Sequence, residues 1–180
     1  MTHTTILPTA FTTAPWKNGG GVTHEIAKSE EDGAWLWRLS IAEVVADGPF
    51  SAFPGLSRIL TVIEGEGLQL HLPDQNLTAL PDKPVAFSGD VPVSSALIKG
   101  PIRDFNVIYD STKISATVEV EQGPTRHMIG SVQSGILSLA GLVKVDGQAL
   151  PVGAFALGTL GALSLGEGAK CIVVRLRAAD

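Results

Sequence analysis

The segment Pro15-Trp16-Lys17-Asn18-Gly19-Gly20-Gly21 combines an aromatic ring, a cation and an amide with three residues that have no side chain. Glycine lets a backbone approach a ligand closely, and successive backbone amides can form a concave site for an anion. Lys17 adds an ammonium group with three hydrogen-bond donors. The segment predicts recognition of a small anion by Trp16, Lys17 and Asn18, although a plain tight turn before a strand would use the same glycines.

A second candidate lies in the run Trp35-Leu36-Trp37-Arg38-Leu39-Ser40-Ile41. In a strand, alternation places Trp35, Trp37, Leu39 and Ile41 on one face and Arg38 with Ser40 on the other. A guanidinium group is a planar fork that suits a carboxylate, and the neighbouring hydroxyl can donate or accept a hydrogen bond. Because arginine is more often exposed to solvent, a binding role for Arg38 and Ser40 requires that they converge with Arg58 and Lys17.

Asp104 and Asn106 share one face of a third expected strand. They supply oxygen acceptors and an amide, which would orient Arg38 or Arg58 or would bind a polar nitrogen of a ligand. A buried charge needs a partner. A salt bridge from Asp104 to an arginine is therefore the structural alternative.

Short apolar stretches alternate with Gly, Pro, Asp and Asn along the chain, which is typical of many brief antiparallel strands. No segment carries an apolar stripe at the helical period over three turns. We predict an all-β fold with a long loop over 122–134 and strands at 22–27, 35–43, 58–63, 67–72, 85–88, 93–99, 104–110, 114–120, 136–145, 154–157, 161–165 and 170–177.

An internal repeat relates the two parts of the chain, because the segments around 85–87, 94–98 and 105–107 parallel those around 153–155, 161–165 and 172–174. Two similar units in tandem are implied. The final strands of the units differ on one face, where Asp104 and Asn106 in the first correspond to Cys171 and Val173 in the second. Since small barrels either fill with side chains or hold a ligand, we expect a site in the first unit only.

Composition excludes several classes of function. The chain has 180 residues, 44% hydrophobic and 17% charged, and a net charge of -5, which argues against a basic surface for nucleic acid. Cys171 is the only cysteine, so a reducing, cytoplasmic location is expected and a cysteine zinc site is excluded. No apolar run approaches membrane-spanning length. No GxSxG or phosphate-loop motif is present, and Cys171 lies in an apolar run.

Four segments carry a resemblance that spans nearly the whole chain: PWKNGGGVTHEIA, WRLSIAEV, DGPFSAFPGLSR and DFNVIYD. Together they resemble the HutD/Ves family of bacterial proteins. This resemblance implies a bicupin, two small jelly-roll-like β-barrels in one chain, which we place at residues 1–110 and 111–180. It also implies an association with histidine utilisation and gives no established catalytic activity.

The resemblance also allows a comparison with metal-binding cupins, which use two histidines and a glutamate ahead of a glycine turn. Counting back from Gly65 places Arg58 at the glutamate position and Ser51 with Phe53, or Ala52 with Pro54, at the histidine positions. A guanidinium group has donors only and cannot coordinate a cation. We therefore expect no metal and no cofactor, and an anion where relatives bind a metal.

The leading prediction is a binding protein for a small anionic carboxylate of histidine degradation, of the urocanate or N-formylglutamate class. The predicted ligand-binding residues are Trp16, Lys17, Asn18, Arg38, Ser40, Arg58, Asp104 and Asn106. The alternative is a metal-independent isomerase or hydrolase of the same metabolites, in which Asp104 or His24 moves a proton, although no catalytic residue can be assigned. A scaffold without a ligand site is the third possibility. A homodimer through strand edges is possible.

Overall fold

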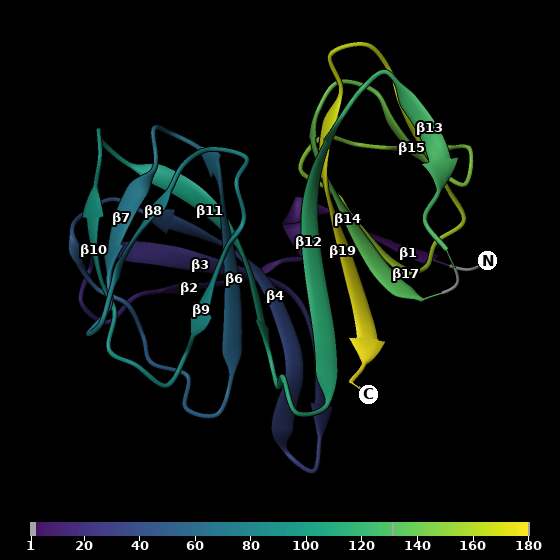
Figure 1. The fold of residues 1–180 in the computed structure, drawn as a ribbon. Coiled ribbons are helices and arrows are strands. Elements are labelled where there is room, and N and C mark those ends of the chain that lie inside the picture. Colours follow the sequence, from purple (N-terminus) through teal and green to yellow (C-terminus); the bar gives the residue numbers. More distant parts are fainter. Residues whose placement is uncertain (1–2, 131, 180) are drawn as a thin grey trace. The chain divides into compact units, whose positions relative to one another are not determined.

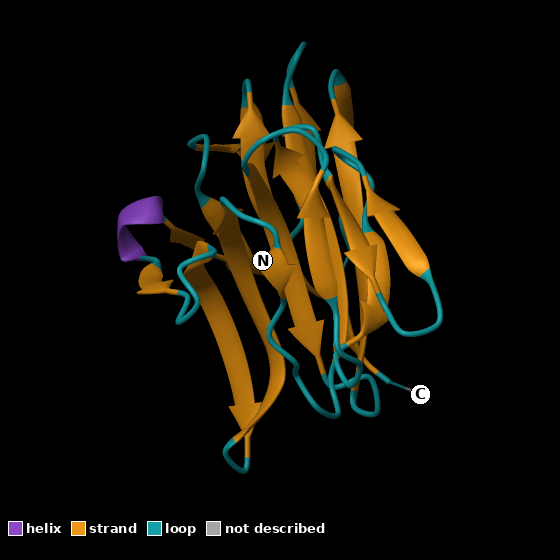
Figure 2. Ribbon diagram, turned by 90° about the vertical axis from the view of Figure 1, so that its left-hand side faces the viewer, coloured by secondary structure: helices purple, strands orange, loops and turns teal. Residues whose placement is uncertain are grey.

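The structure is a computed structural model that describes residues 3–130 and 132–179. Figures 1 and 2 show strands joined by turns, with a single helical turn, η1 (Pro8–Ala10). The all-β prediction is confirmed. The strands are β1 (His3–Ile6), β2 (Thr12–Pro15), β3 (Gly21–Glu31), β4 (Ala34–Val44), β5 (Gly48–Pro49), β6 (Ser57–Glu64), β7 (Leu68–His71), β8 (Asn76–Ala79), β9 (Val85–Ser88), β10 (Ser94–Leu97), β11 (Ile102–Tyr109), β12 (Ile114–Gln122), β13 (Thr125–Met128), β14 (Gln133–Ala140), β15 (Val143–Val145), β16 (Gln148–Leu150), β17 (Phe155–Thr159), β18 (Ala162–Leu165) and β19 (Lys170–Ala178).

The chain forms two compact units. One unit is Thr12–Ile114, and the other joins the described residues up to Phe11 with those from Ser115 onward. Each unit contains two sheets. The first has the strand orders β2-β3-β4-β11-β6-β9 and β5-β10-β7-β8, and the second has β1-β17-β14-β19-β12 and β13-β18-β15-β16.

The two units repeat one topology. The orders β4-β11-β6-β9 and β5-β10-β7-β8 in the first unit match β12-β19-β14-β17 and β13-β18-β15-β16 in the second, so each strand corresponds to the strand eight places later. Adjacent strands pair in antiparallel fashion in both units. The predicted tandem repeat is confirmed, and the fold is a bicupin.

Several local predictions are corrected by the structure. The N-terminal strand β1 pairs with β17, so the start of the chain lies in the second unit and not in a barrel of residues 1–110. The predicted loop 122–134 contains β13, and the predicted strand 136–145 is interrupted at Gly141, whose φ of +65° ends β14. These features depend on pairing with distant strands, which local composition does not encode.

Each unit has its own apolar core. In the second unit the core is lined by residues such as Ile136, Leu163 and Val173, and the buried polar side chains among its described residues are Ser134 and Ser138. The core of the first unit includes Leu60, Val62 and Leu68. Its buried polar set is larger and includes charged groups: Ser40, Arg58, Thr61, Ser95, Asp104 and Asn106. Charged side chains are rarely buried unless they are paired, so this set marks the region of interest.

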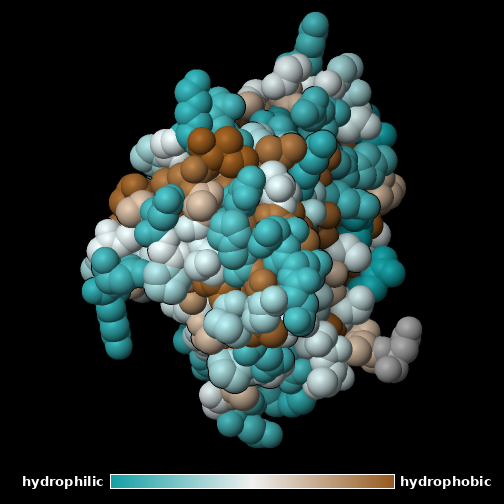
Figure 3. Space-filling model, turned by 60° about the vertical axis from the view of Figure 1, so that its left-hand side comes forward, coloured by the Kyte–Doolittle hydropathy of each residue, from teal (hydrophilic) through white to brown (hydrophobic). Residues whose placement is uncertain are grey.

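Hydrophobic groups on the face shown in Figure 3 are interrupted by hydrophilic residues. Large apolar side chains that are exposed in the described part of the chain are Leu7, Val45, Leu80, Ile98, Met128, Leu142 and Val152. Within the described ranges, no helix is long and apolar enough to cross a membrane.

Candidate functional site: a buried arginine in a small pocket

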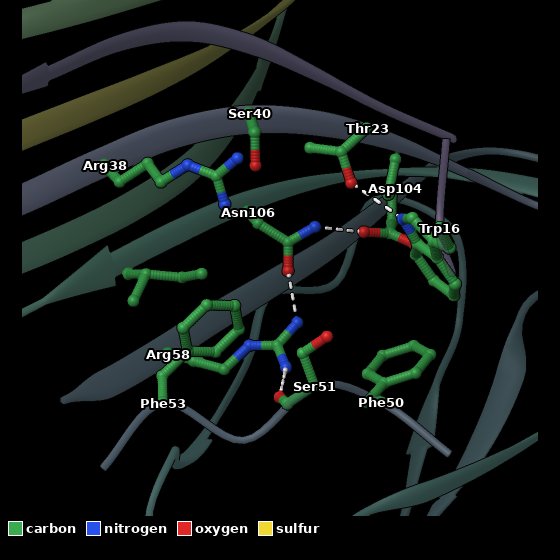
Figure 4. Close-up of a pocket in the computed structure, with 12 residues that line it drawn as sticks. Trp16, Thr23, Arg38, Ser40, Phe50, Ser51, Phe53, Arg58, Asp104 and Asn106 are labelled. Carbon is green, nitrogen blue, oxygen red and sulfur yellow. Dashed lines mark hydrogen bonds between the residues drawn. The ribbon is translucent and has the colours of Figure 1, made fainter. Parts of the chain in front are cut away.

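A pocket of about 50 Å³ lies in the unit Thr12–Ile114. Strands β3, β4, β6 and β11 of the six-stranded sheet and the segment before β6 supply its walls. The lining residues are Trp16, Thr23, Arg38, Ser40, Ala42, Phe50, Ser51, Phe53, Arg58, Asp104, Asn106 and Ile108 (Figure 4). A space of this size accommodates a few water-sized groups, which is the scale of a single carboxylate.

Strand alternation accounts for the polar wall. Residues 38, 40 and 42 of β4 and residues 104, 106 and 108 of β11 all line the pocket, and the register sets Ser40 opposite Asn106 and Arg38 opposite Ile108. Leu39, Phe105 and Val107 point to the other face of the sheet and are fully buried. The predicted shared face of Arg38 with Ser40, and of Asp104 with Asn106, is therefore confirmed.

The prediction for Trp35 is wrong. The register between β3 and β4 shifts between Ser29 and Glu30, so the alternation is broken next to Trp35. The Trp35 ring lies 5.0 Å from the Arg38 guanidinium carbon and 6.0 Å from the Phe53 ring. Trp35 therefore lies on the side of Arg38 and not on the face of Trp37, because a bulge reverses the side on which the next residues point.

Arg58 is the most buried cation of the pocket, with 6% of its surface exposed. Its guanidinium carbon lies 5.1–5.2 Å from the ring centres of Phe50, Phe53 and Phe87, so the charge lies among three aromatic faces. The weakly hydrated guanidinium group tolerates such an apolar enclosure better than an ammonium group would.

A chain of hydrogen bonds links Arg58 to Asp104 through an amide. Arg58 Nη2 donates to Asn106 Oδ1 at 3.0 Å, and Asn106 Nδ2 donates to Asp104 Oδ1 (Figure 4). Arg58 Nη1 makes a longer contact of 3.4 Å with the Ser51 carbonyl oxygen. No salt bridge forms between Arg58 and Asp104 within the described residues, so the expected direct ion pair is replaced by this bridge.

Within the hydrogen-bonded set Arg58, Asn106 and Asp104, two buried atoms have no partner among the described residues: Arg58 Nε and Asp104 Oδ2. A buried donor or acceptor without a hydrogen bond costs about 1–3 kcal/mol. An unsatisfied cation and an unsatisfied carboxyl oxygen in the same pocket are the arrangement expected of a site that a ligand completes.

Burial dominates the electrostatics of this pair. Burial lowers the pKa of Arg58 to about 10, against the opposing attraction of Asp104, so the guanidinium group stays charged at neutral pH. Burial also raises the pKa of Asp104 to about 7, although Arg58 and the hydrogen bond from Asn106 favour its ionised form. Asp104 is thus poised between its neutral and ionised forms near neutral pH.

Arg38 differs from Arg58 in having a carboxylate partner. Its Nε donates to Glu25 Oε2 at 2.7 Å, and its side chain is 16% exposed. Figure 4 shows the guanidinium group ending beside Ser40. Arg38 and Ser40 therefore lie at one pocket wall as predicted, but much of the charge of Arg38 is already balanced by Glu25.

The Trp16 segment forms the opposite side of the pocket. Trp16 Nε1 donates to Thr23 Oγ1 at 2.8 Å, and the ring meets Phe50 edge-on at 5.9 Å. Lys17 and Asn18 line a second, open hollow of about 510 Å³, which shares Trp16, Thr23, Arg38, Phe50 and Ser51 with the small pocket. The predicted residues Lys17 and Asn18 thus lie at an outer hollow, away from the Arg58 guanidinium group.

The glycine amides do not form the expected anion-binding concavity. Gly19 N donates to the Trp16 carbonyl oxygen at 3.1 Å, and Gly20 N donates to Asn18 Oδ1 at 3.0 Å. Gly21 is needed for close packing, because a Cβ atom there would lie 2.4 Å from the Glu43 carbonyl oxygen and 3.1 Å from the Trp16 ring. The glycines therefore form a tight turn that positions the Trp16 ring at the pocket wall.

The histidines lie apart from the pocket lining. His24 contacts Thr13 Oγ1 at 2.8 Å and Glu43 Oε1 at 2.9 Å, and His71 contacts Asn76. His127 lies in β13, not in the predicted loop, and contacts Glu121 Oε2 at 2.7 Å. In the described part of the chain, no three His, Cys, Asp or Glu side chains gather into a group that could hold a metal ion.

Sequence reasoning missed the roles of Thr23, Glu25 and Phe50. Thr23 and Glu25 are two residues apart on β3, so strand alternation could have placed them on one face. The sequence could not have shown that their partners are Trp16 and Arg38. Phe50 precedes Ser51 and Phe53, the positions aligned with cupin histidines, and all three line the pocket with Arg58. Phe87 lies on the neighbouring strand β9, where register places it opposite Arg58.

Among the described residues of the second unit, the positions equivalent to Arg58, Asp104 and Asn106 carry no charged group. The β11–β6 register in the first unit and the β19–β14 register in the second place Ser134, Cys171 and Val173 at the positions of Arg58, Asp104 and Asn106. Cys171 and Val173 are fully buried in an apolar core. Burial raises the pKa of the Cys171 thiol to about 12, so a reactive thiolate is not available there.

Comparisons with known proteins agree in a single family. The HutD family model matches residues 9–178. An uncharacterised 21.2 kDa protein from the hutC 3' region of Pseudomonas putida is 44% identical over 115 residues, which are 62% of this chain and 60% of that relative. The match therefore spans less than two thirds of the relative's length.

Two solved structures cover 99% of this chain and 100% of their own chains. HutD from Pseudomonas fluorescens SBW25, in a formate condition, has a TM-score of 0.88 and 34% identity. A conserved protein of unknown function from Pseudomonas aeruginosa PAO1 has a TM-score of 0.87 and 30% identity. On the family match over residues 9–178 and these likenesses, the chain belongs to the HutD family.

Proposed function

We propose that this protein binds a small carboxylate of histidine degradation in the pocket around Arg58, without a metal, and that binding modulates histidine utilisation. The observation that carries the proposal is the buried guanidinium group of Arg58, which has a free Nε donor and no carboxylate partner among the described residues. An arginine fork matches the two oxygens of a carboxylate. An incoming carboxylate would balance the charge of Arg58.

The dimensions of the site favour a ligand with an acid group at one end. The inner pocket of about 50 Å³ accepts a carboxylate, and the adjoining hollow of about 510 Å³ leaves space for the rest of the molecule. Lys17 and Asn18 line that hollow and offer further donors. Urocanate and N-formylglutamate both have this general form.

The family supplies the metabolic context. The Pseudomonas putida relative is encoded in the hutC 3' region, which ties that protein to histidine utilisation. A receptor for a pathway acid would let the cell adjust the pathway to the concentration of its own intermediate. The context supports the class of ligand, and the pocket chemistry supports its charge.

An enzyme is the second candidate, and one observation favours it. Asp104 has a pKa raised to about 7 and an unpaired oxygen at the pocket, and a group with such a pKa can exchange a proton at neutral pH. A metal-independent isomerase or hydrolase would use it on the same metabolites. Incubation with urocanate or N-formylglutamate and detection of products by mass spectrometry distinguishes turnover from binding alone.

A thermal-shift titration tests the proposal. Wild-type protein and the Arg58→Met variant are titrated with urocanate and N-formylglutamate, with and without a chelator. The matched control is Arg126→Met, at an exposed arginine of the second unit. A ligand that binds only the folded state stabilises it by about 2.7 kcal/mol at one hundred times its dissociation constant.

We expect a chelator-insensitive stabilisation of the wild type and of Arg126→Met, and none of Arg58→Met. The proposal is overturned if neither acid stabilises the wild type at any concentration. It is also overturned if Arg58→Met responds as the wild type does, because the guanidinium group would then have no part in binding.

A further inference from the structure

Asp104 carries the one carboxyl group among the residues that line the pocket, and only one of its two oxygens has a hydrogen-bond partner. Its Oδ1 accepts a hydrogen bond from Asn106, whereas Oδ2 is buried with no partner among the described residues. The residue is 1% exposed, so bulk water does not solvate the free oxygen. An ionised carboxylate in this position would leave an unsatisfied negative oxygen in a pocket that Arg58 prepares for an anion.

The charged groups around Asp104 come from three strands. Arg58 from β6 is the cation that favours the ionised form of Asp104. The two side chains are linked by Asn106, which lies on β11 with Asp104. Arg38 from β4 lines the same pocket and is paired with Glu25 from β3. The residues directly opposite Asp104 in the sheet are Ala42 and Val62, which are apolar. His24 of β3 is engaged by Glu43 and does not line the pocket.

These surroundings make the protonation state of Asp104 depend on the ligand. A second negative charge brought into the pocket would repel an ionised Asp104, because like charges at short range disfavour the charged form. A protonated Asp104 instead offers an O–H donor, and a carboxylate oxygen is a strong acceptor for it. The Asp104 hydroxyl would then gain the partner that Oδ2 lacks in the free pocket.

We propose that Asp104 contacts the ligand in its protonated form, so that the pocket takes up a carboxylate together with one proton. That proton is held on Asp104 Oδ2, and the resulting hydroxyl donates a hydrogen bond to the ligand. This inference rests on the proposed carboxylate-binding function. The proton comes from solvent and returns there on dissociation, and no bond other than the O–H bond of Asp104 is made or broken. The residue thereby selects ligands whose buried end accepts hydrogen bonds.

The expected pH dependence has a definite sign. The free site has a pKa of about 7 at Asp104, and a bound anion raises it. Affinity is then constant below that pKa and falls about tenfold for each pH unit above it, until the pKa of the complex is reached. Arg58 does not contribute in this range, because its pKa of about 10 keeps it charged.

Formate is the probe for the test, because it is small enough for the inner pocket and is fully ionised above about pH 6. Calorimetric titrations at pH 6 and 8 in two buffers of different ionisation enthalpy give the number of protons taken up. We expect about 0.1 proton at pH 6 and about 0.9 at pH 8. The affinity of the wild type should fall roughly tenfold between these values.

Two variants identify the group that binds the proton. In Asp104→Asn the amide presents an N–H donor at any pH, so formate should bind with no proton uptake and with the same affinity, within about twofold, at both pH values. Asp74→Asn, at an exposed acid in the same unit, should behave as the wild type. The ¹³C chemical shift of the Asp104 carboxyl carbon in the wild type, titrated with and without formate, reports the pKa directly and does not depend on the folding of a variant.

The outcomes separate the two proposals. If formate binds the wild type with no proton uptake, or if the carboxyl shift shows no rise in pKa, this inference is wrong and the carboxylate-binding function stands. A proton uptake that persists in Asp104→Asn places the proton elsewhere and also overturns the inference. If formate binds at neither pH, both the proposed function and this inference fail.

Discussion

The Arg58→Met substitution separates the contribution of Arg58 to binding from its contribution to folding. Methionine is an unbranched, adaptable side chain that can occupy the space among Phe50, Phe53 and Phe87, where the guanidinium group now lies. It has no donor for a carboxylate. We expect a folded protein that no longer binds the ligand.

The expected change in the free energy of unfolding follows from opposing contributions of similar size. Burial lowers the pKa of Arg58 to about 10, which corresponds to roughly 3 kcal/mol against the charged form. Removing the charge relieves this penalty. The substitution also removes the hydrogen bond to Asn106 Oδ1, at about 1–3 kcal/mol, and the attraction to the rings, at about 0.5–2 kcal/mol. The net change in the free energy of unfolding should therefore lie between a gain of about 1.5 kcal/mol and a loss of about 2 kcal/mol.

Arg58→Ala provides the contrast. It loses the same charge and hydrogen bond but also leaves a cavity among the three rings. Truncation of a buried methionine to alanine costs about 2–5 kcal/mol, so the alanine variant should be less stable than the methionine variant by about that amount.

Urea unfolding followed by tryptophan fluorescence measures both changes. The chain has 3 tryptophans, Trp16, Trp35 and Trp37, and all belong to the unit that contains the pocket. The signal therefore reports that unit, and linear extrapolation gives its free energy of unfolding. A methionine variant that loses more than about 3 kcal/mol, or one that is no more stable than the alanine variant, would refute the reasoning about burial.

Two further predictions concern the same unit. Asp104 binds a proton more tightly in the folded state, because its pKa is about 7 there, so its contribution to stability is full at low pH and is lost as the pH rises from about 4 to 7. Relative to Asp104→Asn, the wild type should lose on the order of 4 kcal/mol between pH 4 and 8 in urea unfolding, and parallel profiles would contradict the assignment. Gly21→Ala should destabilise the unit by about 1–3 kcal/mol and shift the tryptophan emission, because its Cβ atom would meet the Glu43 carbonyl oxygen at 2.4 Å. Gly20→Ala is the control, since its Cβ atom would meet only the Asn18 side chain, at 3.3 Å or more, and equal stability of the two variants would argue against the close approach at Gly21.

The sequence predicted the features that depend on local periodicity. The period of two in a strand was enough to place Arg38 with Ser40, and Asp104 with Asn106, on one face. The positions aligned with cupin metal ligands pointed to Arg58. The structure brings these five residues to one pocket together with Trp16.

Features that depend on register could not be predicted. The shift between Ser29 and Glu30 moves Trp35 to the side of Arg38, and Glu25 forms an ion pair with Arg38 from the neighbouring strand. The position of Asn106 between Arg58 and Asp104 depends on three side-chain conformations across two strands. The pairing of β1 with β17 joins segments about 150 residues apart, and no local pattern encodes a contact of that range.

The repeated strand order allows each position of the pocket to be compared with an equivalent position in the second unit. The repeat gives two copies of each of these positions, and one copy has an apolar interior while the other buries Arg58 and Asp104. In the second unit Ser134, Cys171 and Val173 occupy the positions that Arg58, Asp104 and Asn106 occupy in the first. Introducing arginine, aspartate and asparagine at those positions would test whether the same three side chains create a second pocket of the proposed kind.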